Sequence, residues 1–326
     1  MILRQTRRQM LAAGAALVVA PGGARAQGFP SKPVKIVVPY PPGGPTDGLA
    51  RIVAEDIRAD LGQNVIVENM AGASGAIGTR AVARAEADGH TIVFGTNQTH
   101  CTNAFLLKEP GYDPVKDFAP LAALADLQHV LVLKKDLAAA TGPDLAALAR
   151  KEPGKLNYGS TGLGSGSHLA MELFRARTGT EMQHIPFPGA APMAQEIMAG
   201  RIDAAMATLP SVLGMIQGGQ MKAAALASAT PAPQLADVKL LRDQGITDAE
   251  ADAWLAFFAP AAIPAAVRDR LAGAILASMR KPEVKERATK LGFAVNLKDS
   301  GQLAAFQATE MKKWTAVAQA AGLKAQ

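Results

Sequence analysis

The sequence predicts an α/β protein of two lobes, each a mainly parallel sheet flanked by helices, joined by a hinge of two strands. Apolar strand-like segments alternate with helix-like segments, the pattern of parallel sheets covered on both faces. A proline-punctuated connection at 109–120 interrupts this alternation, which restarts after Leu127. A late apolar segment, 253–260, is expected to return the chain to the first lobe as a strand.

The first lobe is predicted to consist of residues 27–127 and 253–326. Its first helix is predicted from apolar residues at helical spacing, namely Leu49, Ile52, Val53, Ile57 and Leu61. Strands are expected at 34–40, 64–69, 90–96 and 121–127, and a further helix at 75–87. After the return strand only helices are expected, one containing Val267, Leu271, Ile275 and Met279 and one at 302–321.

The second lobe is predicted to consist of residues 128–252. Strands are expected at 129–133, 156–160, 182–187, 202–207 and 222–228, and helices at 144–150, 167–177, 193–199 and 211–217. Two crossings between the lobes would form a hinge, with a cleft between sheets whose strand ends face each other. Ligands bind in such clefts in open α/β sheets.

Residues 1–26 are predicted to be an export signal. Arg4, Arg7 and Arg8 precede an apolar run at 10–20 that is too short to span a bilayer, and a small-residue cleavage site follows. The paired arginines suggest the twin-arginine route, although general secretory signals can also carry them. Because no cysteine lies near the cleavage point, no lipid anchor is expected, and the mature chain should start at Gln27 in the periplasm.

Composition excludes several classes of function. Removing residues 1–26 takes away four arginines and no acid, so the formal charge falls from +6 to +2. A nearly neutral chain with few aromatic residues and no block of Lys or Arg gives no support for nucleic-acid binding. Cys101 is the one cysteine, so no internal disulfide can form. Scattered histidines without metal-ligand spacing predict no metal site.

A glycine loop at 38–51 leads from the first strand directly into the first helix. The backbone N–H groups of a helix N-terminus are unpaired and the macrodipole is positive there, so this is a place where an anion can bind. The residues at this position are Gly43, Gly44, Thr46 and Asp47. The loop also fits a tight turn in which Thr46 or Asp47 is merely the N-cap.

A second loop, at 159–174, repeats this arrangement of strand, small residues and helix. Hydroxyls and glycine N–H groups in it can donate to a carboxylate, and they belong to Ser160, Thr161, Gly162, Gly164, Ser165 and Ser167. Two such loops facing each other would bind the two ends of a small dianion.

The ordered motifs VPYPPGGPTDGLAR, ENMAGASGAIG, YDPVKDFAP, LNYGSTGLGSGSHLAMELF, HIPFPGAAPM and WLAFFAP resemble the extracytoplasmic receptors of tripartite tricarboxylate transporters, the Bug family. The resemblance covers nearly the whole mature chain. It implies a type II-like periplasmic binding protein, without enzymatic activity or cofactor. Such a protein closes on a small carboxylate of the di- or tricarboxylate class and delivers it to a membrane permease, and we expect it to be a monomer.

The resemblance also implies the residues that contact the ligand. In the first lobe these are Tyr40, Pro42, Gly43, Gly44, Thr46, Asp47, Ala71, Gly72, Ala73, Ser74, Gly75, Thr96 and Asn97. In the second lobe they are Ser160, Thr161, Gly162, Gly164, Ser165, Ser167, His168, Phe187 and Gly189. Asp47 either faces the ligand or only caps its helix.

The chain departs from many relatives in two places. It has Pro188 where they have Lys, and Ala207 and Thr208 where they have Asp or Asn followed by Asn or Ser. A buried ammonium would need a carboxylate partner, so the absence of an acid at Ala207 favours a carboxylate ligand without a charged amine.

Two other classes of function remain as alternatives. A receptor that docks on a membrane signalling protein would use the same cleft. A hydrolase would need Ser165, Ser167 and His168 to act together, but no serine has the glycine spacing of a nucleophile elbow. Ser167 is interpreted as the helix N-cap and His168 as a residue of the first helical turn. Gly162, Gly164 and Ser167 lack the third glycine of a dinucleotide fingerprint.

Overall fold

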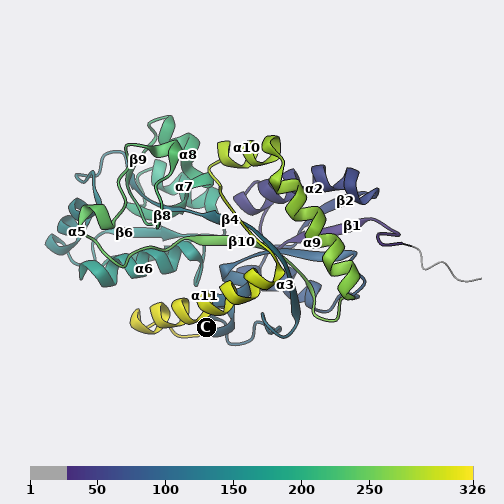
Figure 1. The fold of residues 1–326 in the computed structure, drawn as a ribbon. Coiled ribbons are helices and arrows are strands. Elements are labelled where there is room, and N and C mark those ends of the chain that lie inside the picture. The colour runs from purple at the N-terminus through teal and green to yellow at the C-terminus, as the bar shows by residue number, and fades with distance from the viewer. Residues whose placement is uncertain (1–27, 326) are drawn as a thin grey trace, which may run out of the picture.

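The computed structural model describes residues 28–325, which form two lobes side by side (Figure 1). One lobe contains a six-stranded sheet of order β11-β4-β10-β3-β1-β2, and the other a five-stranded sheet of order β7-β6-β8-β5-β9. The predicted export signal lies outside the described residues. None of the helices within 28–325 is long and apolar enough to cross a membrane.

The six-stranded sheet forms the first lobe. Its strands are β1 (Val34–Val38), β2 (Val65–Asn69), β3 (Thr91–Thr96), β4 (Phe118–Leu127), β10 (Ala253–Pro260) and β11 (Ala294–Lys298). Alternating side chains are buried on both faces of β1: Ile36 packs toward helices α2 (Pro45–Leu61), α9 (Ala265–Arg280) and α10 (Pro282–Lys290), whereas Val37 packs toward α3 (Ala76–Ala83). Burial on both faces explains why this strand is a continuous apolar run.

The five-stranded sheet forms the second lobe. Its strands are β5 (His129–Lys134), β6 (Asn157–Ser160), β7 (Gln183–Pro186), β8 (Ala204–Thr208) and β9 (Met221–Leu226). The helices around it are α5 (Gly142–Lys151), α6 (Gly166–Thr178), α7 (Ala190–Met198) and α8 (Leu209–Gln217). Short helical turns are η1 (Ala73–Gly75), η3 (Pro233–Leu235) and η4 (Arg242–Gln244).

The predicted two-lobed α/β class is confirmed, and both sheets are mixed. β1, β2 and β3 pair in parallel, as do β6, β7 and β8. The antiparallel pairs involve the strands that connect the lobes: β10 pairs with β3 and β4, β11 pairs with β4, and β5 pairs with β8 and β9. A chain that crosses to another lobe and returns reverses direction, which accounts for these pairs.

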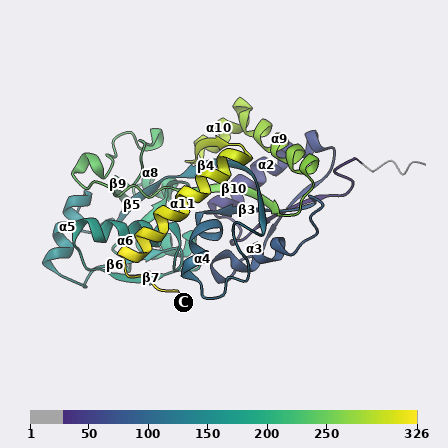
Figure 2. The ribbon, with the colours of Figure 1, turned by 60° about the horizontal axis from the view of Figure 1, so that its bottom comes forward.

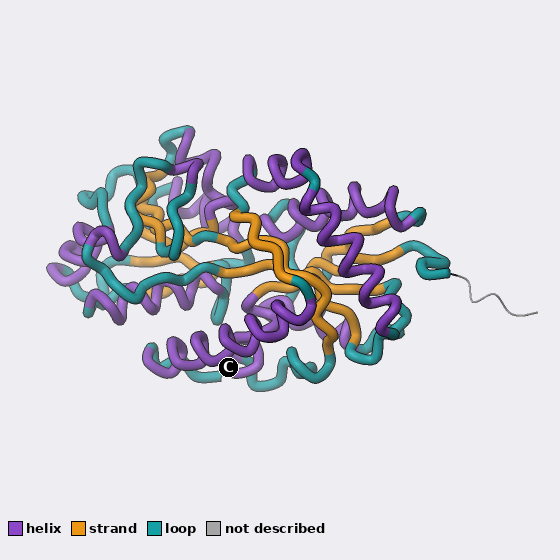
Figure 3. The backbone as a smooth tube through the Cα atoms, viewed as in Figure 1, coloured by secondary structure: helices purple, strands orange, loops and turns teal. Residues whose placement is uncertain are grey.

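Two adjacent segments connect the lobes. β4 continues through Gln128 into β5, and β10 returns beside β4 with Ala253 opposite Leu127. Figure 3 shows these strands as long orange tubes at the centre that run from one lobe toward the other. The predicted strand at 253–260 therefore has the predicted position at the crossing.

The C-terminal region differs from the prediction of helices alone. Strand β11 lies at the sheet edge beside β4, between α10 and α11 (Ser300–Ala320). Only five residues long and only partly buried, it lacks the strong apolar pattern that identifies a central strand. A helical segment after β3, made of η2 (Gln98–Thr102) and α4 (Asn103–Leu106), was also not predicted, and α3 ends at Ala83 rather than 87.

Helix α11 packs against both lobes (Figure 2). Leu303, near its start, lies in a core cluster of the first lobe. Trp314 and Ala318, near its end, lie in the core cluster of the second lobe that includes Phe174. Packing thus attaches the end of α11 to the second lobe, although the sequence prediction placed all of 253–326 in the first.

Candidate ligand-binding cleft between the lobes

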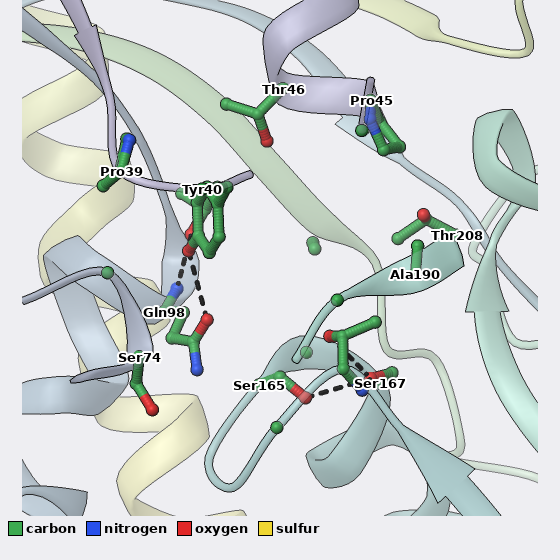
Figure 4. A pocket seen from close by; sticks show the side chains of 18 of the residues that line it. Pro39, Tyr40, Pro45, Thr46, Ser74, Gln98, Ser165, Ser167, Ala190 and Thr208 are labelled. Carbon is green, nitrogen blue, oxygen red and sulfur yellow. Dashed lines mark hydrogen bonds between the residues drawn. The ribbon is translucent and has the colours of Figure 1, made fainter. Parts of the chain in front are cut away.

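A cavity of about 290 Å³ lies between the lobes and is lined by residues of both. Figure 4 shows Tyr40, Ser74 and Gln98 of the first lobe opposite Ser165, Ser167 and Thr208 of the second. Most of the predicted contact residues line it, namely Tyr40, Gly44, Thr46, Gly72, Ala73, Ser74, Gly75, Thr96, Asn97, Thr161, Gly162, Ser165, Ser167, Phe187 and Gly189. The others, Pro42, Gly43, Asp47, Ala71, Ser160, Gly164 and His168, do not line it.

The first glycine loop ends with Gly44 as the N-cap of α2, and no side chain caps this helix end. Neither Thr46 nor Asp47 is therefore the N-cap, because Pro45 takes the first helical position and fixes the helix start before them. Gly43 has φ +82°, a left-handed conformation that favours glycine.

The carboxylate of Asp47 holds this loop in place through hydrogen bonds. It accepts hydrogen bonds from Gly43 N (3.0 Å), Arg51 Nε (3.0 Å) and Asn69 Nδ2 (3.0 Å). Burial alone would raise the pKa of Asp47, but the bonds from Arg51, Gly43 and Asn69 outweigh it and hold the pKa below its usual value. The carboxylate is thus charged and fully occupied within the loop.

The second loop forms a cluster of hydroxyl groups at the start of α6. The N-cap is Ser165 rather than the predicted Ser167, and its Oγ accepts a hydrogen bond from His168 N (3.2 Å). Ser167 Oγ accepts from Thr161 N (2.9 Å) and lies 2.9 Å from Ser165 Oγ. Gly166, between the two serines, is the first residue of α6. The sequence spacing alone does not reveal that the helix starts there.

Three predicted residues of this loop support it without lining the cavity. Ser160 Oγ lies 2.6 Å from His184 Nε2. Gly164 has φ +70°, a left-handed conformation that favours glycine, and a Cβ atom there would lie 2.9 Å from Leu106 Cδ1. Gly164 N donates to His168 Nδ1 at 3.1 Å.

His168 lies within a buried aromatic stack. Its ring centroid is 4.0 Å from that of His184, which in turn stacks on Tyr158. Burial, with His184 and Arg175 nearby, lowers the pKa of His168 to about 3, so the ring is neutral. Within residues 28–325 no serine hydroxyl bonds to this ring, so Ser165, Ser167 and His168 do not form a catalytic triad here.

Hydrogen bonds cross the cleft to two carbonyls of the second loop. Thr102 Oγ1 donates to Gly164 O (2.9 Å), and both Ser74 Oγ and Gln98 Nε2 approach Leu163 O (3.4 Å each). The side chain of Gln98 also accepts from Tyr40 Oη (3.1 Å). The two lobes therefore touch at one rim of the cavity.

The cavity is lined by helix N-termini and by no charged side chain of the described chain. None of the lining residues, all within the described chain, is Lys, Arg, Asp or Glu. Among the described helices, five begin at a residue that lines the cavity: the N-caps of α2, α3, α6, α7 and α8 are Gly44, Gly75, Ser165, Gly189 and Thr208. Each N-terminus directs the positive end of its helix dipole toward the cavity. At α2, α6 and α7 the first-turn N–H groups are also available to a ligand, whereas Ala76 N at the start of α3 donates to Ala73 O, and Leu209 N at the start of α8 donates to Gln128 O at 2.8 Å.

Sequence reasoning missed several lining residues. Those outside every predicted contact segment are Pro39, Gln98, Leu127, His129, Ala190, Thr208 and Ala253, whereas Pro45, Gly166 and Pro188 lie within segments predicted to contact the ligand. Leu127, His129 and Ala253 reach the cavity only because β4, β5 and β10 meet at the hinge, so no local motif marks them. Thr208 follows a strand directly before a proline-initiated helix, a signal that could have identified it.

A two-lobed α/β fold with a cavity between the lobes, lined by helix N-termini, defines the class of solute-binding receptors. The model of the tripartite tricarboxylate transporter family receptor, TctC, matches residues 49–323. The chain belongs to this family of periplasmic solute-binding receptors.

Individual relatives agree with this assignment, and the resemblance inferred from the motifs is confirmed. A Pseudomonas sp. protein described as the UPF0065 protein in the tcbD-tcbE intergenic region is 35% identical over 312 residues, which cover 94% of this chain and 92% of the relative. Protein BugT of Bordetella pertussis is 30% identical over 297 residues, 91% of each chain.

Solved structures show the same fold. R. palustris Rpa4515 with adipate has a TM-score of 0.88 at 30% identity, over 91% of this chain and 100% of that chain. MatC from Rhodopseudomonas palustris with bound malate has a TM-score of 0.82 at 29% identity, over 89% of this chain and 99% of that chain.

Proposed function

We propose that this receptor captures a small carboxylate of the di- or tricarboxylate class in the cavity between its lobes. The observation that carries the proposal is the set of five helix N-termini that begin at the cavity wall. The similarity to structures with adipate and with malate supports the same ligand class.

The energetics of such a site are sufficient without a charged side chain. A helix N-terminus stabilises an anion by about 0.3 to 1 kcal/mol, and by up to about 2 kcal/mol in partly buried geometry. A hydrogen bond to a charged group adds about 1.5 to 3 kcal/mol. A micromolar affinity corresponds to about 8 kcal/mol, so a few such contacts to each carboxylate account for it.

The ligand is proposed to carry no charged amine. An ammonium group enclosed in the cavity would need a carboxylate partner, and the lining residues of the described chain include no acid. Ala207, where many relatives have an acid or an amide, is fully buried and apolar. Comparable affinity for acidic amino acids and for the corresponding simple dicarboxylates would contradict this part of the proposal.

Capture is proposed to work by closure of the lobes about the hinge, with residues 27–127 and 253–326, apart from the end of α11 that packs on the second lobe, moving against 128–252. A ligand bound to both lobes favours the closed state by its differential affinity for that state. The mature, monomeric receptor would then deliver the carboxylate from the periplasm to the permease of a tripartite tricarboxylate transporter. Its role is binding, not catalysis.

The test is thermal stabilisation of the chain from Gln27 onward against dicarboxylates, tricarboxylates, aromatic acids, acidic amino acids and neutral sugars. Ligand at 100 times its dissociation constant should add about 2.7 kcal/mol to the free energy of unfolding. We expect melting shifts with di- or tricarboxylates and none with sugars. No shift with any carboxylate would overturn the proposal.

A further inference from the structure

At the hinge end of the cavity, His129 is a buried side chain with one unsatisfied ring nitrogen. It is the first residue of β5, is fully buried and lines the cavity. Its Nδ1 lies 2.6 Å from Ala251 O. Because a carbonyl oxygen only accepts hydrogen bonds, Nδ1 must carry the proton that is donated to it.

The other ring nitrogen is therefore an acceptor. Burial lowers the pKa of His129 to about 4, so the ring is neutral at neutral pH and Nε2 presents a lone pair. Within residues 28–325, Nε2 has no hydrogen-bond partner. A buried polar atom left without a partner is costly, so a ligand or water group that donates a proton is expected there.

Asn97 provides a second unsatisfied group at the same place. Its side chain is 1% exposed, lines the cavity, and its Nδ2 has no partner among the described residues. A Cβ atom at Gly166 would lie 3.0 Å from His129 Cε1 and 3.4 Å from Asn97 Nδ2. The imidazole and the amide therefore both pack closely on Gly166, at the start of α6.

The chemistry of the pair selects among ligand groups. A carboxylate only accepts hydrogen bonds, so it can satisfy the Asn97 amide but not the lone pair of a neutral His129. A hydroxyl can donate to His129 Nε2 and accept from Asn97 Nδ2 through the same oxygen. A ligand hydroxyl thus matches both groups.

We propose that His129 and Asn97 form a subsite that binds a hydroxyl group of the ligand, so that this receptor selects hydroxylated di- or tricarboxylates over their unsubstituted analogues. The inference rests on the proposed function, since the carboxylates themselves are bound at the helix N-termini. It adds the substituent that distinguishes one carboxylate from another.

The test compares matched ligand pairs by isothermal titration calorimetry on the mature wild-type protein. The pairs are malate with succinate, and citrate with propane-1,2,3-tricarboxylate. A site built to hydrogen-bond a hydroxyl discriminates strongly against the analogue that lacks it, so we expect at least about tenfold tighter binding of one hydroxylated member. Equal affinities within both pairs would overturn the inference and leave the proposed function standing, with an ordered water in the subsite.

The variant His129→Asn tests the residue itself. The shorter amide can still donate toward Ala251 O but presents nothing at the position of Nε2. We expect it to lower the affinity for the hydroxylated ligand about tenfold while leaving the affinity for the unsubstituted one unchanged. As a comparison, Ser167→Ala in the second loop should weaken both members of a pair equally. An unchanged ratio in His129→Asn would overturn the assignment.

Proton uptake on binding distinguishes a ligand hydroxyl at His129 from a ligand carboxylate paired with a protonated His129. If His129 became protonated and paired with a ligand carboxylate, binding would take up a proton, and affinity would fall about tenfold per pH unit above the pKa. We expect no uptake, measured as a binding enthalpy independent of the buffer between about pH 6 and pH 8. Measured uptake of one proton would contradict the hydroxyl subsite. Failure of every carboxylate to bind would instead remove the proposed function.

Discussion

Gly44 is the residue at which the charge of the cavity can be changed with little disturbance of the fold. It is the N-cap of α2, its φ of −81° suits any residue, and a Cβ atom there would meet only Pro41 O at 3.7 Å. Both Asp and Asn are favoured at an N-cap. A pair of variants can therefore differ in charge while both retain the helix start.

We expect Gly44→Asp to lower carboxylate affinity by at least about tenfold, and Gly44→Asn to lower it much less. The aspartate puts a negative charge where the proposed anion binds, at a cost of about 1 kcal/mol or more at short range in a partly buried site. Titration calorimetry with the preferred ligand gives the affinities, and melting temperatures at or above that of the wild type would show that both variants fold. Equal affinities of the two variants would argue against an anion site at this helix.

Asp252 makes the stability of the protein depend on pH. It is partly buried where the second crossing segment enters β10, and it accepts a hydrogen bond from Ser228 Oγ (2.9 Å). Burial raises the pKa of this carboxyl to about 6, with nearby Asp126 acting in the same direction. The folded state thus holds the proton more tightly than the unfolded chain, whose pKa is near 3.8.

The stabilising contribution of protonated Asp252 is therefore full below about pH 4 and is lost as the pH rises through about 6. Each unit of the pKa difference corresponds to 1.36 kcal/mol, so we expect Asp252→Asn to stabilise the protein by about 1 to 3 kcal/mol at pH 8. Near pH 4 the variant and the wild type should be similar. Melting curves of both proteins across this range measure the effect, and a difference that does not change with pH would refute it.

Among the elements, α11 contributes to both lobes, and Trp314 is its anchor in the second. Trp314 is fully buried, packs in the cluster with Phe174, and its Nε1 donates to Glu310 Oε2 at 2.8 Å. Leu303, equally buried, anchors the start of the helix in the first lobe. The two anchors can be removed separately.

We expect Trp314→Ala to destabilise the protein by about 3 to 5 kcal/mol, as large core truncations do. Because its anchor in the second lobe is lost, the end of α11 should exchange its amide hydrogens faster. Leu303→Ala should also destabilise, by about 2 to 5 kcal/mol, but with faster exchange at the start of the helix. Hydrogen exchange measured by mass spectrometry distinguishes the two patterns, and identical patterns would contradict separate anchoring.

An element can be predicted from the sequence when a pattern within its own residues identifies it. The helix that contains Leu49 and Ile57 has a periodic apolar pattern, and the strand at 34–38 is an apolar run buried on both faces; both were predicted. Ser165 was not identified as an N-cap, because Ser165 and Ser167 are both suitable and only the hydrogen bond from His168 N decides between them. Edge strand β11 is too short and too exposed to show a pattern.

For the candidate site, the loops were accessible to sequence reasoning and the hinge was not. Glycines and hydroxyl residues between a strand and a helix can be recognised in the sequence, and they favour an anion-binding N-terminus. His129 carries no such signal, because its position in the cavity depends on the pairing of β5 with β8 and on the return of the chain at Ala251. The residues that line the cavity at the hinge therefore depend on long-range topology, whereas the loop residues that line it can be recognised from local sequence.

At the scale of the whole molecule, the contacts across the cleft link ligand binding to the arrangement of the lobes. Thr102 is fully buried in the first lobe, and its hydroxyl donates to Gly164 O of the second lobe at 2.9 Å. If closure is the working motion, this bond stabilises the closed state alone. Its loss should then shift the equilibrium toward the open state and lower the apparent affinity by the same factor.

We expect Thr102→Val to weaken ligand binding about threefold to tenfold, since a net hydrogen bond contributes about 0.5 to 1.5 kcal/mol. Thr315→Val is the matched control, because Thr315 Oγ1 bonds only to Met311 O within α11 (2.7 Å), and it should leave the affinity unchanged. Small-angle scattering should show a decrease in radius of gyration when ligand is added to the wild type, and a less complete decrease in Thr102→Val at the same ligand concentration. An identical radius with and without saturating ligand would mean that the lobes do not close, and that Thr102 serves only to hold the second loop in place.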